Sequence, residues 1–68
     1  MKLSKEQYEL LTEALKNKVV FKECEDNSFQ VENRRSVLKE HYAYLNDEEL
    51  NQLYYKNCEL VQTELELM

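Results

Sequence analysis

Every turn in this chain has to be made without glycine or proline, because its 68 residues contain neither. Average composition predicts about five glycines and three prolines at this length. The lack of glycine excludes the Gly-rich phosphate-binding loops, the EF-hand calcium loop and the nucleophile elbow of the α/β-hydrolases. Asn, Asp and Ser must therefore make the turns, and the expected breaks fall at Asn17, Asp26-Asn27, Asn33 and Asn46.

Length and charge limit the classes of protein to which the chain can belong. Its 68 residues predict a single small domain (1–68) near the size at which one core gives marginal stability. A net charge of −5 makes nucleic acid an unlikely partner, and Arg34-Arg35 is the only basic cluster. No apolar run reaches the ~18–20 residues of a membrane span. No signal peptide is visible, and two cysteines are too few for a disulfide scaffold. We expect a cytoplasmic protein.

Residues 47–66 are predicted to form the longest helix. Asn46 can cap its first turn, and Glu49 occupies the reciprocal position of a capping box. Apolar residues follow with the helical period of about 3.6 residues, at Leu50, Tyr54, Cys58, Val61, Leu65 and Met68. Leu53, Leu60 and Leu67 widen this stripe. On a 100°-per-residue wheel the widened stripe covers about half of the helix, more than one short neighbouring helix can bury.

Two shorter helices are predicted on either side of a less regular segment. Ser4 and Gln7 can form a capping box, and apolar residues follow at helical spacing, which predicts a helix over 5–16. A second amphipathic stretch predicts a helix over 35–45. A short connection would let this helix return antiparallel to the helix over 47–66.

The segment from 18 to 33 admits two structures. Its β-branched and aromatic residues favour a short β-hairpin over 18–32, with Phe21 opposite Phe29, Val19 opposite Val31 and a loop at 23–27. The alternative is that the first helix continues and a new helix starts near Asp26, which would give an all-α three-helix bundle. We favour a mainly α fold with the hairpin.

Catalytic and metal chemistry have weak support in the sequence. Cys24, His41 and Cys58 are the candidate zinc ligands, but structural zinc sites usually contain a close pair of ligands, which is missing here. A reactive Cys–His pair needs a cleft and oxyanion donors, and paired carboxylates need a pocket that shifts their pKa values. A chain of this length offers little room for either. We expect no enzyme activity, no metal and no cofactor.

Five residues are the candidate contacts for a partner protein: Tyr44, Tyr55, Asn57, Leu60 and Leu67. Asn57 falls inside the apolar arc of the helix over 47–66, where a polar residue can fix register or oligomeric state. Tyrosines at the edge of an apolar stripe supply contact area at low entropic cost. A wide apolar face is typical of an interface, and oligomerisation stabilises small cores.

These features predict a small acidic regulatory or inhibitory protein that binds a host or cognate protein and forms a homodimer. The Lys-, Asn-, Glu- and Tyr-rich composition is typical of short accessory proteins of phages and mobile elements. Two other functions remain open. The acidic side chains could mimic nucleic-acid phosphates and inhibit a DNA-binding protein, or Arg34-Arg35 could serve a small DNA-binding regulator.

The stretch Leu45-Asn46-Asp47-Glu48-Glu49-Leu50, followed by Leu53-Tyr54-Tyr55-Lys56, resembles the first helix of the helical-hairpin sporulation inhibitors that bind sensor histidine kinases. The resemblance covers about a dozen positions, and much of it is a capping box with amphipathic spacing. The second helix of that family has no counterpart here. The resemblance implies a small helical protein that occupies the surface of another protein.

Overall fold

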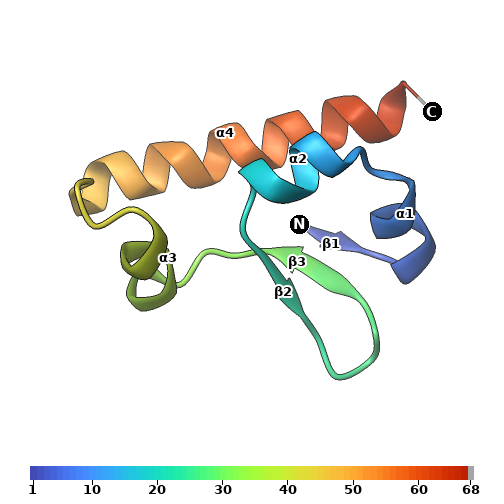
Figure 1. The fold of residues 1–68 in the computed structure, drawn as a ribbon, viewed down its shortest axis with the longest axis horizontal. Coiled ribbons are helices and arrows are strands. Elements are labelled where there is room, and N and C mark those ends of the chain that lie inside the picture. The colour runs from blue at the N-terminus through green and yellow to red at the C-terminus, as the bar shows by residue number, and fades with distance from the viewer. Residues whose placement is uncertain (68) are drawn as a thin grey trace.

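A computed structural model describes residues 1–67 of the protein. Within them the chain forms four helices and a three-stranded antiparallel sheet (Figure 1). The elements are, in order, β1 (Lys2–Leu3), α1 (Lys5–Leu10), α2 (Glu13–Lys18), β2 (Phe21–Glu23), β3 (Phe29–Val31), α3 (Arg35–His41) and α4 (Asp47–Glu66). Helices and sheet occur together, so the alternative of an all-α three-helix bundle is wrong.

Helix α4 has the predicted bounds and the predicted N-terminal cap. The Asn46 side chain accepts a hydrogen bond from the Glu49 N–H at 2.8 Å, and the Glu49 carboxylate accepts one from the Asn46 N–H at 3.0 Å. The other elements gather along one side of this helix (Figure 1). Each apolar residue of the predicted stripe from Leu50 to Leu65 is buried or half-buried. Leu67 is exposed, and Met68 lies outside the described residues.

The hairpin is present, but its register differs from the predicted one. Phe21 pairs with Val31 and Glu23 with Phe29, a shift of two residues that keeps each side chain on its predicted face. The turn explains the shift: the Cys24 N–H donates to the Ser28 carbonyl, which places the loop at 24–28. Asn27 takes the left-handed conformation there, with φ of 65°. Asparagine tolerates this region better than most residues.

The sheet contains a strand that the sequence did not predict. Strand β3 lies in the centre, between β2 and the two-residue strand β1, and Leu3 of β1 pairs with Phe29. The Tyr8 ring of α1 stacks on Phe29 at 3.9 Å and meets the edge of Phe21 at 5.1 Å between centroids. The aromatic contact expected between the two phenylalanines is therefore made through Tyr8.

The predicted helix over 5–16 is divided into α1 and α2 at Leu11 and Thr12. The Ser4–Gln7 capping box is confirmed at the start of α1. Leu11 and Thr12 are both extended, with ψ of 149° and 152°, and the Thr12 side chain caps α2 by accepting from the Leu15 N–H. Because of this break the buried Leu11 turns into the core. Asn17 lies inside α2 and forms no break.

A carboxylate from α4 completes the cap at this break. Glu64 accepts a hydrogen bond from the Thr12 N–H at 2.6 Å and another from the Thr12 hydroxyl at 3.3 Å. The two residues are far apart in the sequence, so the contact ties the C-terminal part of α4 to the start of α2. A carboxylate is favourable there because it faces unpaired N–H groups at the positive end of a helix.

Replacing Glu64 by alanine is expected to lower the free energy of unfolding by about 1–2 kcal/mol, because the Thr12 N–H loses a charged acceptor. Urea denaturation followed by circular dichroism measures this change. Glu66→Ala is the matched control, since Glu66 is an exposed glutamate in the same turn. The control should cost less than about 0.5 kcal/mol. Equal costs for the two variants would contradict the assigned cap.

Helix α3 ends at His41, four residues before the predicted end of the helix over 35–45. Tyr42 leaves the helical conformation, and its hydroxyl donates to the Lys18 carbonyl at the end of α2, at 3.1 Å. This tertiary bond stabilises the chain outside the helix and satisfies an otherwise free carbonyl. Residues 42–46 therefore form a longer connection to α4 than the sequence predicted.

The core contains residues from both halves of the chain. Its buried cluster consists of Leu3, Leu11, Leu15, Val19, Val31 and Val61. The α4 face is thus covered within one chain by β1, β3 and α2. None of the helices in residues 1–67 is long and apolar enough to cross a membrane.

Candidate binding site

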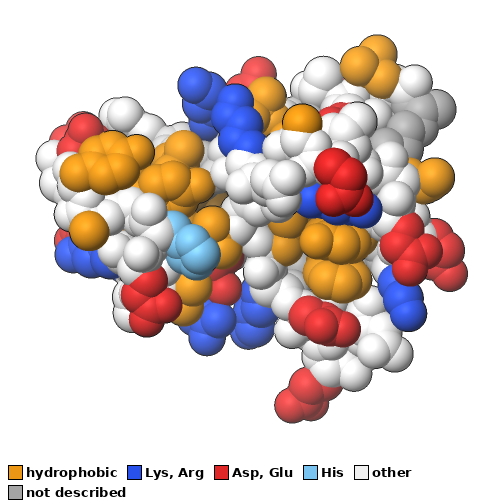
Figure 2. Space-filling view, in the orientation of Figure 1, with side chains coloured by type: hydrophobic (Ala, Val, Ile, Leu, Met, Phe, Trp, Pro, Cys, Tyr) orange, Lys and Arg blue, Asp and Glu red, His pale blue; other side chains and the backbone are white. Residues whose placement is uncertain are grey.

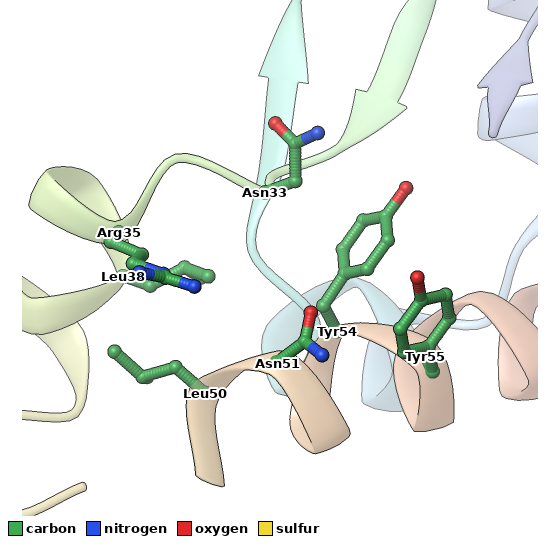
Figure 3. Close-up of a pocket in the computed structure, with 7 residues that line it drawn as sticks. All are labelled: Asn33, Arg35, Leu38, Leu50, Asn51, Tyr54 and Tyr55. Carbon is green, nitrogen blue, oxygen red and sulfur yellow. The ribbon is translucent and has the colours of Figure 1, made fainter. Parts of the chain in front are cut away.

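An open pocket lies between α3 and the first half of α4, with a volume of about 220 Å³. We call it the α3–α4 pocket. Its lining residues are Asn33, Arg35, Leu38, Leu50, Asn51, Tyr54 and Tyr55 (Figure 3). They come from the β3–α3 connection and from both helices, so the pocket exists only when α3 is packed on α4.

The floor of the α3–α4 pocket is apolar. Leu38 of α3 is 3% exposed and Leu50 of α4 is 1% exposed. Both residues belong to the apolar stripes that pack the two helices together. The floor is therefore part of the folded core and is held in a fixed position.

The rim of the pocket is polar and carries two adjacent tyrosines. Tyr55 is 65% exposed, whereas Tyr54 is half-buried, and their rings meet edge to face at 5.4 Å. The Tyr54 hydroxyl points to the side of the pocket where Asn33 lies (Figure 3). Interaction with the neighbouring Cys58 thiol, and then partial burial, raise the pKa of Tyr54. Its hydroxyl is thus protonated at neutral pH and can donate a hydrogen bond.

Charge at the pocket comes from Arg35, which shares the carboxylate of Asp47 with Lys39. The Lys39 ammonium lies 3.1 Å from Asp47, and the Arg35 guanidinium lies 3.5 Å from it. Lys39, and then Arg35, hold the pKa of Asp47 below its usual value. Because Lys39 makes the shorter contact, Arg35 is the more loosely held of the two cations.

The structure brings one of the five sequence-predicted contact residues to the pocket. Tyr55 lies on the rim, whereas Tyr44, 80% exposed, lies in the turn before α4. Asn57 is buried at 3% exposure, so in this fold its side chain is not offered to a partner. Leu60 is half-buried and packs against the core cluster, and Leu67 is exposed at the end of α4. Asn57 and Leu60 are thus engaged in packing within the chain, whereas Tyr44, Tyr55 and Leu67 are exposed.

Sequence reasoning did not single out the other pocket residues. The apolar stripes could have indicated Leu38 and Leu50, and the Arg34-Arg35 cluster could have indicated Arg35. No pattern in the sequence marks Asn33 or Asn51, which are simply polar. The pocket depends on where α3 sits against α4, which no local pattern specifies.

A second hollow lies beside the start of α1 and is lined by Ser4, Lys5, Glu6, Asp26, Asn27 and Ser28. Its polar groups bond with one another and with neighbouring residues. Asp26 forms an ion pair with Lys2 at 2.8 Å and accepts hydrogen bonds from Ser28. The bonds from Lys2 and Ser28 hold the pKa of Asp26 well below its usual range. These contacts tie the hairpin loop to β1, which is a structural role.

Neither cysteine is in a disulfide, and Cys24 and Cys58 are both half-buried thiols. In the described part of the chain, no group of three or more His, Cys, Asp and Glu residues is arranged to hold a metal ion. The sequence matches no protein family, no curated protein and no solved structure. The comparisons therefore add nothing to the resemblance to the sporulation inhibitors, and the pocket is the starting point for a function.

Proposed function

We propose that this chain is a small regulatory or inhibitory protein that binds another protein through the α3–α4 pocket. One observation carries the proposal: the exposed Tyr55 stands on the rim of a pocket whose floor is the buried pair Leu38 and Leu50. Interface residues that dominate binding are often tyrosines beside well-packed apolar pockets. No catalytic step is part of this function.

The size of the pocket favours a side chain as its occupant. Pockets that enclose small-molecule ligands measure about 300–1,000 Å³, and this one measures about 220 Å³. A single large side chain of a partner protein suits the smaller volume. The polar rim then supplies hydrogen bonds around an apolar centre, the usual anatomy of a protein interface.

A different protein is a better-supported partner than a second copy of the chain. The homodimer was predicted from an α4 face too wide for one short helix to cover, and that face is covered within the chain. On the face in Figure 2 the hydrophobic side chains reach the surface in separate patches. The exposed large hydrophobic residues are Met1, Leu10, Tyr44, Tyr55 and Leu67. Self-association of the chain remains a prediction, and sedimentation equilibrium tests it.

The two nucleic-acid functions gain no support from an observation of the structure. Arg34 is bonded to the buried Glu32, which leaves Arg35 as the one cation of the pair with donors to spare, too few for a surface that follows a phosphate backbone. Under either function, as a nucleic-acid mimic or as a DNA-binding regulator, the affinity for the partner should fall steeply as the salt concentration rises. Binding through the pocket should respond much less.

Site-specific photo-crosslinking tests the proposed function. With p-benzoylphenylalanine at position 55, we expect a covalent adduct with one protein in an extract of the cells that produce the chain. Position 56 is the control, because Lys56 is exposed on the same helix and does not line the pocket. The adduct should be absent there and should be competed by excess unmodified chain. Equal crosslinking from both positions would contradict the proposal, and adducts of twice the chain mass would indicate a homodimer.

A further inference from the structure

We propose that the α3–α4 pocket recognises an acidic side chain that lies next to an apolar side chain on the partner protein. The guanidinium of Arg35 would bind the carboxylate, and the floor made by Leu38 and Leu50 would take the apolar neighbour. This inference rests on the proposed function, in which the pocket contacts another protein.

The charge of the lining residues points to an anionic ligand. None of the seven lining residues is acidic, and Arg35 is the one cation among them. The hollow beside α1, by contrast, is lined by Lys5 together with Glu6 and Asp26. The α3–α4 pocket is the one of the two whose lining complements a negative charge.

Arg35 has hydrogen-bond donors to spare. A guanidinium carries five N–H donors, and within residues 1–67 the structure gives Arg35 one contact with a carboxylate, at 3.5 Å to Asp47. Its side chain extends from α3 over the space between the two helices (Figure 3). Lys39, at 3.1 Å, stays with Asp47 when Arg35 turns to a ligand. The fork of arginine matches the planar geometry of a carboxylate.

Neutral groups complete the site. The amides of Asn33 and Asn51 and the hydroxyls of Tyr54 and Tyr55 can donate to oxygens that Arg35 does not reach. An adjacent apolar side chain would lie over the buried leucines. The small volume admits one such side chain, so the recognised element is a short segment.

A nucleic acid fits this pocket poorly. Its backbone would bring many phosphates towards an acidic chain that offers one cation at the site, whereas such complexes neutralise several phosphates with Lys and Arg. A single carboxylate on a protein can be paired by the one guanidinium of Arg35.

Two-fold pairing of two chains through α4 also fits poorly. Glu66 and Leu67 have the required chemistry, but Leu67 lies about 160° around the helix from Asn51 on a 100°-per-residue wheel. Two-fold pairing of two α4 helices brings the same face of each into contact. Such pairing would not place Leu67 in the pocket of the other copy.

Selection of random short peptides on the immobilised full chain tests the inference. We expect enriched peptides to carry Asp or Glu beside Leu, Ile, Phe or Tyr. Arg35→Gln should weaken the best peptide about tenfold or more, as should replacing its acidic residue by the amide. When Arg35→Gln is combined with the amide substitution in the peptide, the second change should weaken binding little further. Fluorescence anisotropy measures these affinities, and circular dichroism checks that the exposed substitution leaves the fold intact.

Lys56→Gln is the matched control. It removes the same charge, and Lys56 is exposed and does not line the pocket. Its effect on affinity should stay within about twofold, because a charge outside the site acts only at long range. Asp47→Asn releases Arg35 and should strengthen peptide binding. Glu48→Gln removes one negative charge at the adjacent position, and it should strengthen binding less than Asp47→Asn does.

The outcomes separate the inference from the proposed function. Peptides that need Tyr55 but lack an acidic residue, and that bind Arg35→Gln as well as the unchanged chain, would overturn the inference alone. If no enriched peptide depends on Tyr55, both fail. A dimer that dissociates on Tyr55→Ala would assign the pocket to a second copy and would also overturn the inference.

Discussion

Replacing Leu3 by alanine is expected to leave the protein largely unfolded. Leu3 is 1% exposed and belongs to the core cluster with Val31 and Val61. Leucine-to-alanine changes in a core cost about 2–5 kcal/mol. A single core in a domain of this size supplies about 3–5 kcal/mol in total. Far-UV circular dichroism and urea denaturation measure the loss.

Leu10→Ala is the control for this prediction. Leu10 is also near the N-terminus but is 65% exposed, and alanine is favourable in the helix that contains it. The control should change the free energy of unfolding by less than about 0.5 kcal/mol. If Leu3→Ala were as stable as Leu10→Ala, strand β1 would not be part of the core.

Replacing Arg34 by alanine is expected to destabilise the protein through the carboxylate that it leaves behind. Glu32 is 3% exposed and accepts three hydrogen bonds from Arg34: one from the backbone N–H at 2.9 Å and two from the guanidinium at 2.9 and 3.0 Å. The alanine variant retains only the backbone bond. A buried polar group left without a partner costs about 1–3 kcal/mol, and a charged group costs more. Arg35→Ala, which breaks an exposed ion pair, is the control and should cost little.

The same variant should change how stability depends on pH. Hydrogen bonds from the Arg34 guanidinium hold the pKa of Glu32 below its ordinary value of about 4.3. This stabilisation is therefore present above about pH 4.3 and is lost as the pH falls through the lowered pKa. Without Arg34, burial favours the protonated acid. The stability gap between the unchanged chain and Arg34→Ala should accordingly narrow between about pH 7 and pH 3. A gap of constant size would contradict the assignment.

The elements that the sequence predicted correctly are those specified by neighbouring residues. The capping boxes at Ser4 and Asn46 each involve two residues three positions apart. The bounds of α4 follow from one such box and from a long period of apolar residues. The hairpin follows from two β-branched and aromatic runs, although its register depended on the left-handed conformation of Asn27.

The features that the sequence missed depend on residues far apart in the chain. Glu64 stabilises the break at Thr12 from 52 positions away, and the Tyr42 hydroxyl bonds Lys18 from 24 positions away. Strand β1 is only two residues long and exists because β3 offers it a partner. The α3–α4 pocket depends in the same way on how two helices pack. Local patterns contain no information on these contacts.

The pairing of β1 with β3, under the cover of α4, has a consequence for the order in which the protein is made. Leu3 leaves the ribosome before Val31 and Val61, its partners in the core cluster. The nascent chain therefore exposes its apolar residues until α4 has emerged, and folding follows synthesis of that helix. Such an interval is when an incomplete chain is most prone to aggregation and to capture by chaperones.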